Sequence, residues 1–197
     1  MGSSTTMITS THQSIFKDDF YFYKIDNILL MTSSNEHQKN ENKLQFVNFK
    51  KINLNYNYKF NNDLNDNFLG LGWSYNNIKS GIWSDGYISS LLFNIDNINK
   101  DLVFEINCVP YLNNKHKHQD IEIYYNNILI KKINFEFGKT NNNLIKFELR
   151  KELITNSNIE LRFKFKNPGS PSDYRESPDS KKLGILLKNI SVKEKII

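Results

Sequence analysis

The sequence lacks several residue types and patterns that whole classes of protein require. Alanine is absent from all 197 residues, which removes the strongest helix former and disfavours an all-helical fold. The single cysteine, Cys108, excludes a disulfide within the chain, and its apolar surroundings predict a buried core thiol. The chain has no apolar stretch of about 18 residues and no basic-then-apolar leader. We therefore expect a cytoplasmic protein without a membrane span.

The signatures of common catalytic classes are missing as well. There is neither a Gly-x-Ser-x-Gly elbow nor a glycine loop that could cradle phosphates. The glutamates of the apolar segments alternate with core residues, so we expect them to face solvent rather than converge as a glycosidase pair. His116 and His118 have only Asp120 nearby, and we predict solvated loop histidines rather than a metal site. We expect neither a metal nor a cofactor.

What the chain has in quantity is strand-forming residues. Aromatic residues make up 13%, mostly Phe and Tyr, which favours strands. The Asn126-Asn127 pair tolerates the left-handed conformation and predicts a tight hairpin turn. Nine or ten strands without a convincing helix predict an all-β fold, an antiparallel two-sheet β-sandwich of jelly-roll type. Alternating or continuous apolar segments occur at 20–23, 28–31, 44–60, 87–95, 102–109, 121–125, 128–137, 144–149, 159–165 and 184–192.

The chain divides into a short tail and one domain. Residues 1–14 are rich in Ser and Thr, and their opening is typical of sequence added for expression, so we predict a disordered or expression-derived tail. Residues 15–197 are enough for a single β-sandwich domain.

The net charge of +5 does not indicate a class of binding partner, because acidic and basic residues are interspersed along the chain. Asn57 and Lys59 alternate with aromatic residues at 56–60, which fits one core face and one wet face better than a stacking platform. We therefore predict no nucleic-acid partner.

One stretch has a composition unlike the rest. Residues 69–86 (LGLGWSYNNIKSGIWSDG) hold both tryptophans and four of the eight glycines. Glycine serves tight turns and close approaches, and Trp offers a large apolar face with one polar handle. The stretch is either a structural corner of the sheet fold or a platform for a ligand.

Two stretches resemble a known family. Residues 72–74 (GWS) and 81–91 (GIWSDGYISSL) are similar to a motif of bacterial β-sandwich domains found beside or fused to glycosyltransferases of capsule and lipopolysaccharide synthesis. Residues 170–184 (SPSDYRESPDSKKLG) resemble, without a gap, the C-terminal signature of the same domains. The likeness spans roughly residues 68–193, and it leads us to expect that the two stretches meet at one end of the sandwich.

The sequence departs from the family pattern in two places. Asn76-Asn77 replace a glutamate, so no acid or base role is carried over from that position. Tyr174-Arg175 stand where Leu-Gly is usual.

The resemblance implies a non-catalytic, carbohydrate-binding-like accessory domain in surface-polysaccharide synthesis. Aromatic faces stack on sugar rings and planar polar groups bind their hydroxyls, whereas an arginine suits a carboxylate-bearing or phosphorylated sugar. The expected partners are a glycan or other sugar-containing ligand and a glycosyltransferase. The candidate ligand-binding residues are Trp73, Tyr75, Asn76, Asn77, Trp83, Ser84, Asp85, Asp173 and Arg175.

Two alternatives stay open. The first is an enzyme that modifies or transfers onto such a polysaccharide, with Asp85, Asp173 or Asp179 as acid or base. The second is a structural module for protein interaction.

Overall fold

The computed structural model of the protein describes residues 20–25, 28–33, 45–47, 49–60, 68–74, 80–139 and 143–196, in two compact units, Met1–Asn48 and Phe49–Ile197. The first unit contains an antiparallel sheet of β1 (Phe20–Ile25), β2 (Ile28–Ser33) and β3 (Gln45–Val47). The antiparallel pairing of β1 with β2 joins two of the predicted apolar segments, 20–23 and 28–31. The predicted tail, residues 1–14, and the predicted start of the domain at residue 15 lie outside the described residues.

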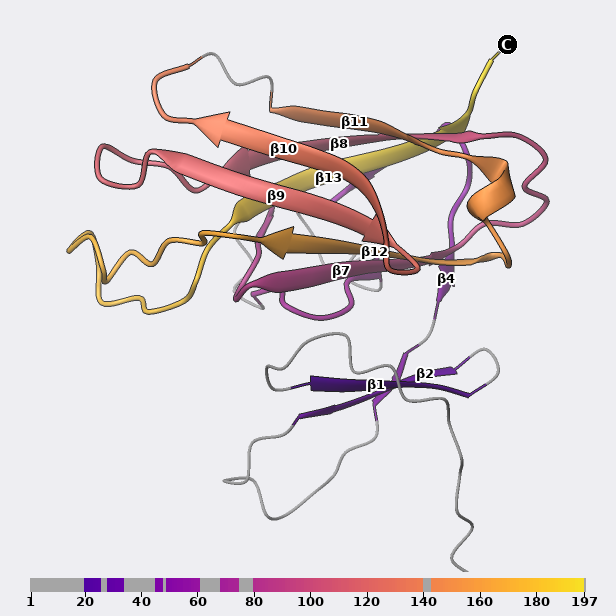
Figure 1. Cartoon of the computed structure of the whole chain (residues 1–197), viewed down its shortest axis with the longest axis horizontal. Coiled ribbons are helices and arrows are strands. Elements are labelled where there is room, and N and C mark those ends of the chain that lie inside the picture. The colour runs from indigo at the N-terminus through magenta and orange to yellow at the C-terminus, as the bar shows by residue number, and fades with distance from the viewer. Residues whose placement is uncertain are drawn as a thin grey trace, which may run out of the picture. The chain divides into compact units, whose positions relative to one another are not determined.

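The second unit is a β-sandwich of two sheets (Figure 1). Its strands are β4 (Lys50–Lys51), β5 (Asn57–Lys59), β6 (Ile82–Trp83), β7 (Ile88–Asn94), β8 (Leu102–Pro110), β9 (His118–Tyr125), β10 (Ile128–Glu136), β11 (Leu144–Leu149), β12 (Asn158–Phe165) and β13 (Ile185–Glu194). A short 3-10 helix, Lys151–Leu153, links β11 to β12. No helix in the described part of the chain is long and apolar enough to cross a bilayer.

The strand order is that of a jelly roll. One sheet runs β10-β9-β12-β7-β4 and the other β11-β8-β13-β5, with β6 also beside β13. The chain therefore crosses between the sheets at most connections, and β13 fills the space between β8 and β5. The predicted antiparallel two-sheet sandwich is confirmed, with the exception that β4 pairs with β7 in parallel at a sheet edge.

The alternation over residues 44–60 predicted one continuous strand, and this prediction is wrong. The segment is divided among β3, β4 and β5, and a turn at Asn55 separates β4 from β5. Asn55 has a left-handed φ of 63°, and its N–H donates to the Val192 carbonyl at 2.7 Å. The turn allows β4 to pair with one sheet and β5 with the other.

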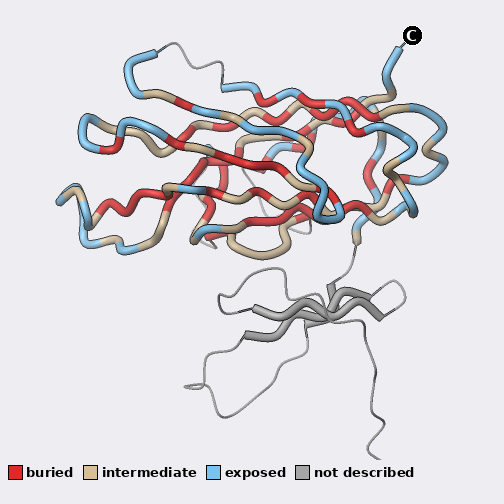
Figure 2. Tube along the Cα trace, in the orientation of Figure 1, coloured by how far each residue is buried: buried red, intermediate tan, exposed pale blue. Residues whose placement is uncertain are grey.

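Inward-facing positions of both sheets form one hydrophobic core (Figure 2). Burial alternates strictly along β11 and β12, and the rings of Phe104 and Phe147 stack with their centroids 5.1 Å apart. Cys108 is fully buried, and burial raises the pKa of its thiol to about 12, which confirms the predicted core thiol. The hairpin turn predicted at Asn126-Asn127 is also confirmed, with φ values of 46° and 65°.

Tyr125→Phe is expected to raise the free energy of unfolding by about 1 kcal/mol, measured by urea denaturation. The Tyr125 hydroxyl is fully buried and has no hydrogen-bond partner among the described residues, so its desolvation is uncompensated. Tyr124→Phe is the matched control, because the Tyr124 hydroxyl donates to Glu122 at 2.7 Å. An equal loss of stability in both variants would contradict the expectation.

Candidate functional site

The two stretches that carry the family resemblance lie against each other. β6 pairs with β13, with Trp83 opposite Leu186. The Ser84 N–H donates to the Ile185 carbonyl and the Gly86 N–H to the Lys182 carbonyl, each at 2.8 Å. The expectation that residues 70–86 and 170–184 meet is therefore confirmed.

The side chain of Ser84 joins these stretches from inside. It is fully buried, and its Oγ accepts hydrogen bonds from the N–H groups of Gly184 at 2.8 Å and Ile185 at 3.0 Å. A hydroxyl committed to two backbone donors and without exposed surface cannot contact a ligand directly. The predicted role of Ser84 as a ligand contact is thus corrected to a structural one.

Trp73 is a core residue. It is 6% exposed, its Nε1–H donates to the Ser90 carbonyl at 2.7 Å, and its ring meets Phe163 edge to face. Gly72 makes this placement possible, because its φ is +70° and a Cβ there would lie 1.9 Å from the Ile88 carbonyl oxygen. The prediction that Trp73 presents a stacking face is therefore wrong.

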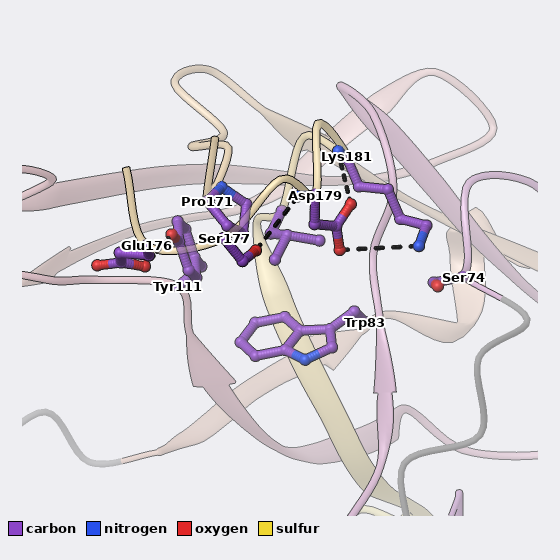
Figure 3. A pocket seen from close by; sticks show the side chains of 9 residues that line it. Ser74, Trp83, Tyr111, Pro171, Glu176, Ser177, Asp179 and Lys181 are labelled. Carbon is purple, nitrogen blue, oxygen red and sulfur yellow. Dashed lines mark hydrogen bonds and ion pairs between the residues drawn. The ribbon is translucent and has the colours of Figure 1, made fainter. Parts of the chain in front are cut away.

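Trp83 is partly exposed and lines a pocket of about 330 Å³, the Trp83 pocket (Figure 3). The Tyr111 ring meets the Trp83 ring edge to face, with centroids 5.9 Å apart and an interplanar angle of 84°. The remaining lining residues are Ser74, Pro171, Glu176, Ser177, Asp179, Lys181 and Leu183.

The loop that follows Pro171 supplies the polar wall of the Trp83 pocket. Asp179 accepts a hydrogen bond from the Lys181 N–H at 3.0 Å, and the Lys181 ammonium lies 3.7 Å from the same carboxylate. The Tyr111 hydroxyl donates to Glu176 at 2.6 Å; burial, and next this bond, raise the pKa of Tyr111. An aromatic wall therefore faces a wall of acidic and basic groups.

Asp85 does not line the Trp83 pocket, but two residues that do, Lys181 and Asp179, act on it electrostatically. Its pKa is raised, chiefly because burial penalises the charged carboxylate, while Lys181 lowers it and Asp179 raises it. Its backbone N–H donates to the Gly72 carbonyl at 2.7 Å.

Two other predicted residues are not brought to the Trp83 pocket. Asp173 is exposed and pairs with Lys182, and Arg175 is exposed with a φ of 60°. Neither lines the pocket. Tyr75, Asn76 and Asn77 lie outside the described residues, so their role in binding a ligand stays a prediction.

His116, predicted to be solvated, is buried at 7% exposure, so that prediction is wrong. Its ring stacks on Tyr111, and its Nδ1 lies 2.9 Å from the Tyr174 hydroxyl. Burial lowers its pKa. In the described part of the chain, no group of three or more His, Cys, Asp or Glu residues is placed to hold a metal ion.

Sequence reasoning missed Tyr111 and Glu176. Tyr111 follows β8, just past the predicted strand segment 102–109, and Glu176 sits in a bend without a local motif. One signal was available for Tyr111: the alternation of β8, continued past Pro110, places it on the same outward side as Asn107 and Val109.

Ser84→Ala is expected to lower the free energy of unfolding by about 2 kcal/mol, because it removes the acceptor of two buried N–H groups. Chemical denaturation measures the loss, and Ser80→Ala, at an exposed position, is the matched control. A stability equal to that of the control would contradict the structural role of Ser84.

No protein-family profile and no curated protein matches the chain. Among solved structures, a family 6 carbohydrate-binding module is similar to 75% of this chain and 99% of its own, at 12% identity and a TM-score of 0.38. Dimeric latent PorU from Porphyromonas gingivalis is similar to 71% of this chain and 12% of its own, at 9% identity and a TM-score of 0.31. Since both TM-scores lie below 0.5, the jelly-roll assignment rests on the strand order of the chain itself.

Proposed function

We propose that the protein is a non-catalytic, carbohydrate-binding accessory domain of bacterial surface-polysaccharide synthesis, either of capsule or of lipopolysaccharide. The observation that carries the proposal is the Trp83 pocket, in which an aromatic wall faces a polar one. The resemblance of residues 72–91 and 170–184 to domains found with glycosyltransferases supports the biosynthetic context and a glycosyltransferase as partner.

The groups that line the Trp83 pocket match the chemistry of a sugar. One face of a sugar ring presents C–H groups, which the aromatic edge and face of Trp83 and Tyr111 can contact. The hydroxyls around the ring need donors and acceptors, which Ser177, Asp179 and Lys181 provide. The volume of about 330 Å³ lies at the lower end of the range for small-ligand pockets.

Trp83→Ala is expected to weaken glycan binding by about 2 kcal/mol, roughly thirtyfold in Kd, because it removes the aromatic face. A glycan array identifies the ligand for the wild type, and calorimetry compares the variants at matched folded fractions. Tyr87→Ala is the control, because Tyr87 is 58% exposed and does not line the Trp83 pocket. Unchanged affinity in Trp83→Ala, or an equal loss in Tyr87→Ala, would refute the assignment of the Trp83 pocket.

One observation favours a second candidate, an enzyme acting on the same polysaccharide. The raised pKa of Asp85 keeps its carboxyl protonated to a higher pH than usual, and Asp179 contributes to this shift. General acid catalysis of glycan chemistry uses a carboxyl whose pKa is raised in this way. Asp173 has no part in this chemistry, because its carboxylate is paired with Lys182.

The pH dependence of two variants tests the enzyme. If Asp85 donates a proton, the rate falls as pH rises through its raised pKa. Asp179→Asn removes a charge that raises this pKa, so the fall moves to lower pH; Lys181→Gln removes a charge that lowers it, so the fall moves to higher pH. The measurement is product release from bacterial surface polysaccharide across pH. Absence of turnover in the wild type at every pH would eliminate the enzyme and leave the binding domain.

A further inference from the structure

A second pocket, of about 390 Å³, lies on the β11-β8-β13-β5 sheet, and we propose that it binds a neutral, hydroxyl-rich sugar chain. It is named the amide pocket here for three of its lining residues, Asn57, Asn107 and Asn189. It is separate from the Trp83 pocket and shares with the proposed function only the class of ligand.

The pairing register brings the side chains of the amide pocket together. Asn189 of β13 lies opposite Asn107 of β8, which lies opposite Leu144 of β11. Residues directly opposite each other in antiparallel strands have Cβ atoms about 5 Å apart. A neighbouring row on the same side of the sheet consists of Glu105, Ser191 and Asn57.

A β-bulge turns Asn189 to the outside. Leu187, which is fully buried, lies opposite Cys108, and Asn189 lies opposite Asn107, so Lys188 is an extra residue in β13. Regular alternation from Leu187 would point Asn189 into the core. Bulges re-aim side chains near functional sites, and this one adds an amide to the pocket.

The side-chain amides of the three asparagines are available to bind a ligand. Within the described residues, no hydrogen bond joins the side chain of Asn57, Asn107 or Asn189 to another residue. Each amide therefore keeps a donor and an acceptor side by side, which is the arrangement that binds neighbouring hydroxyls. Asparagine is also disfavoured in strands, so three of them in two neighbouring rows of one sheet are not explained by strand formation.

The charged groups of the amide pocket favour a neutral occupant. The Glu105 carboxylate is 2.9 Å from the Lys193 ammonium and 3.1 Å from that of Lys146, and these bonds lower its pKa. The carboxylate and both ammonium groups are thus engaged with one another. Leu144 is 50% exposed and adds an apolar contact for the C–H face of a sugar. Four strands at about 4.8 Å spacing give the ligand roughly 14 Å of sheet to cross.

Nuclear magnetic resonance of the full chain tests the amide pocket directly. Neutral oligosaccharides of the glucan, xylan and mannan series are titrated in, and the side-chain amide signals of Asn57, Asn107 and Asn189 are followed. We expect these signals to shift in the wild type, and to shift equally when the titration is repeated with Trp83→Ala.

The double variant Asn107→Ala/Asn189→Ala is expected to bind about tenfold more weakly, because two hydrogen bonds are lost. Asn99→Ala, at an exposed position outside both pockets, is the matched control.

The outcomes separate this proposal from the proposed function. Shifts confined to the surroundings of Trp83 overturn the amide pocket and leave the Trp83 pocket intact. Shifts confined to the amide pocket support it and overturn the role of the Trp83 pocket. An affinity that falls equally in Asn99→Ala, or shifts at neither pocket with any of the three series, also overturns the amide pocket.

Discussion

The buried hydroxyl of Ser84 joins the two chain segments that form the Trp83 pocket. The Oγ of Ser84 accepts hydrogen bonds from two N–H groups of the closing strand segment, about a hundred residues further along the chain. Trp83 directly precedes Ser84, and Leu183 directly precedes Gly184. Because these bonds lie in a buried, low-dielectric environment, they fix the distance between the aromatic wall and the segment that leads to the polar wall.

The strands could be predicted because alternation is a local pattern that the core enforces. In the segments 144–149 and 159–165 every second side chain points inward, and the Asn126-Asn127 turn follows from the backbone freedom of asparagine. Residues 44–60 show where a local pattern fails. The alternation continues through Asn55, although the left-handed conformation there sends the chain from one sheet to the other.

The candidate site could be predicted only in part, because its decisive contacts are long-range. Trp73 and Trp83 are both followed by serine, so the local motif does not distinguish them. Trp73 is buried because Gly72 lets its backbone approach β7, whereas Trp83 is left at the surface beside Tyr111. Tyr111 and Glu176 are joined by a hydrogen bond although they are 65 residues apart in the sequence, and no local motif predicts such a pair.

The place of β13 in the sheet has a consequence for folding during synthesis. β13 is the last strand of the described chain, yet it lies between β8 and β5 and also pairs with β6. Until it emerges from the ribosome, one edge of β8 has no partner, and such an edge invites pairing with other chains. Sandwich closure therefore depends on contacts distant in sequence, which slow folding in general. Trp83 pairs with β13 and four residues of β13 line the amide pocket, so neither pocket is complete until β13 has paired.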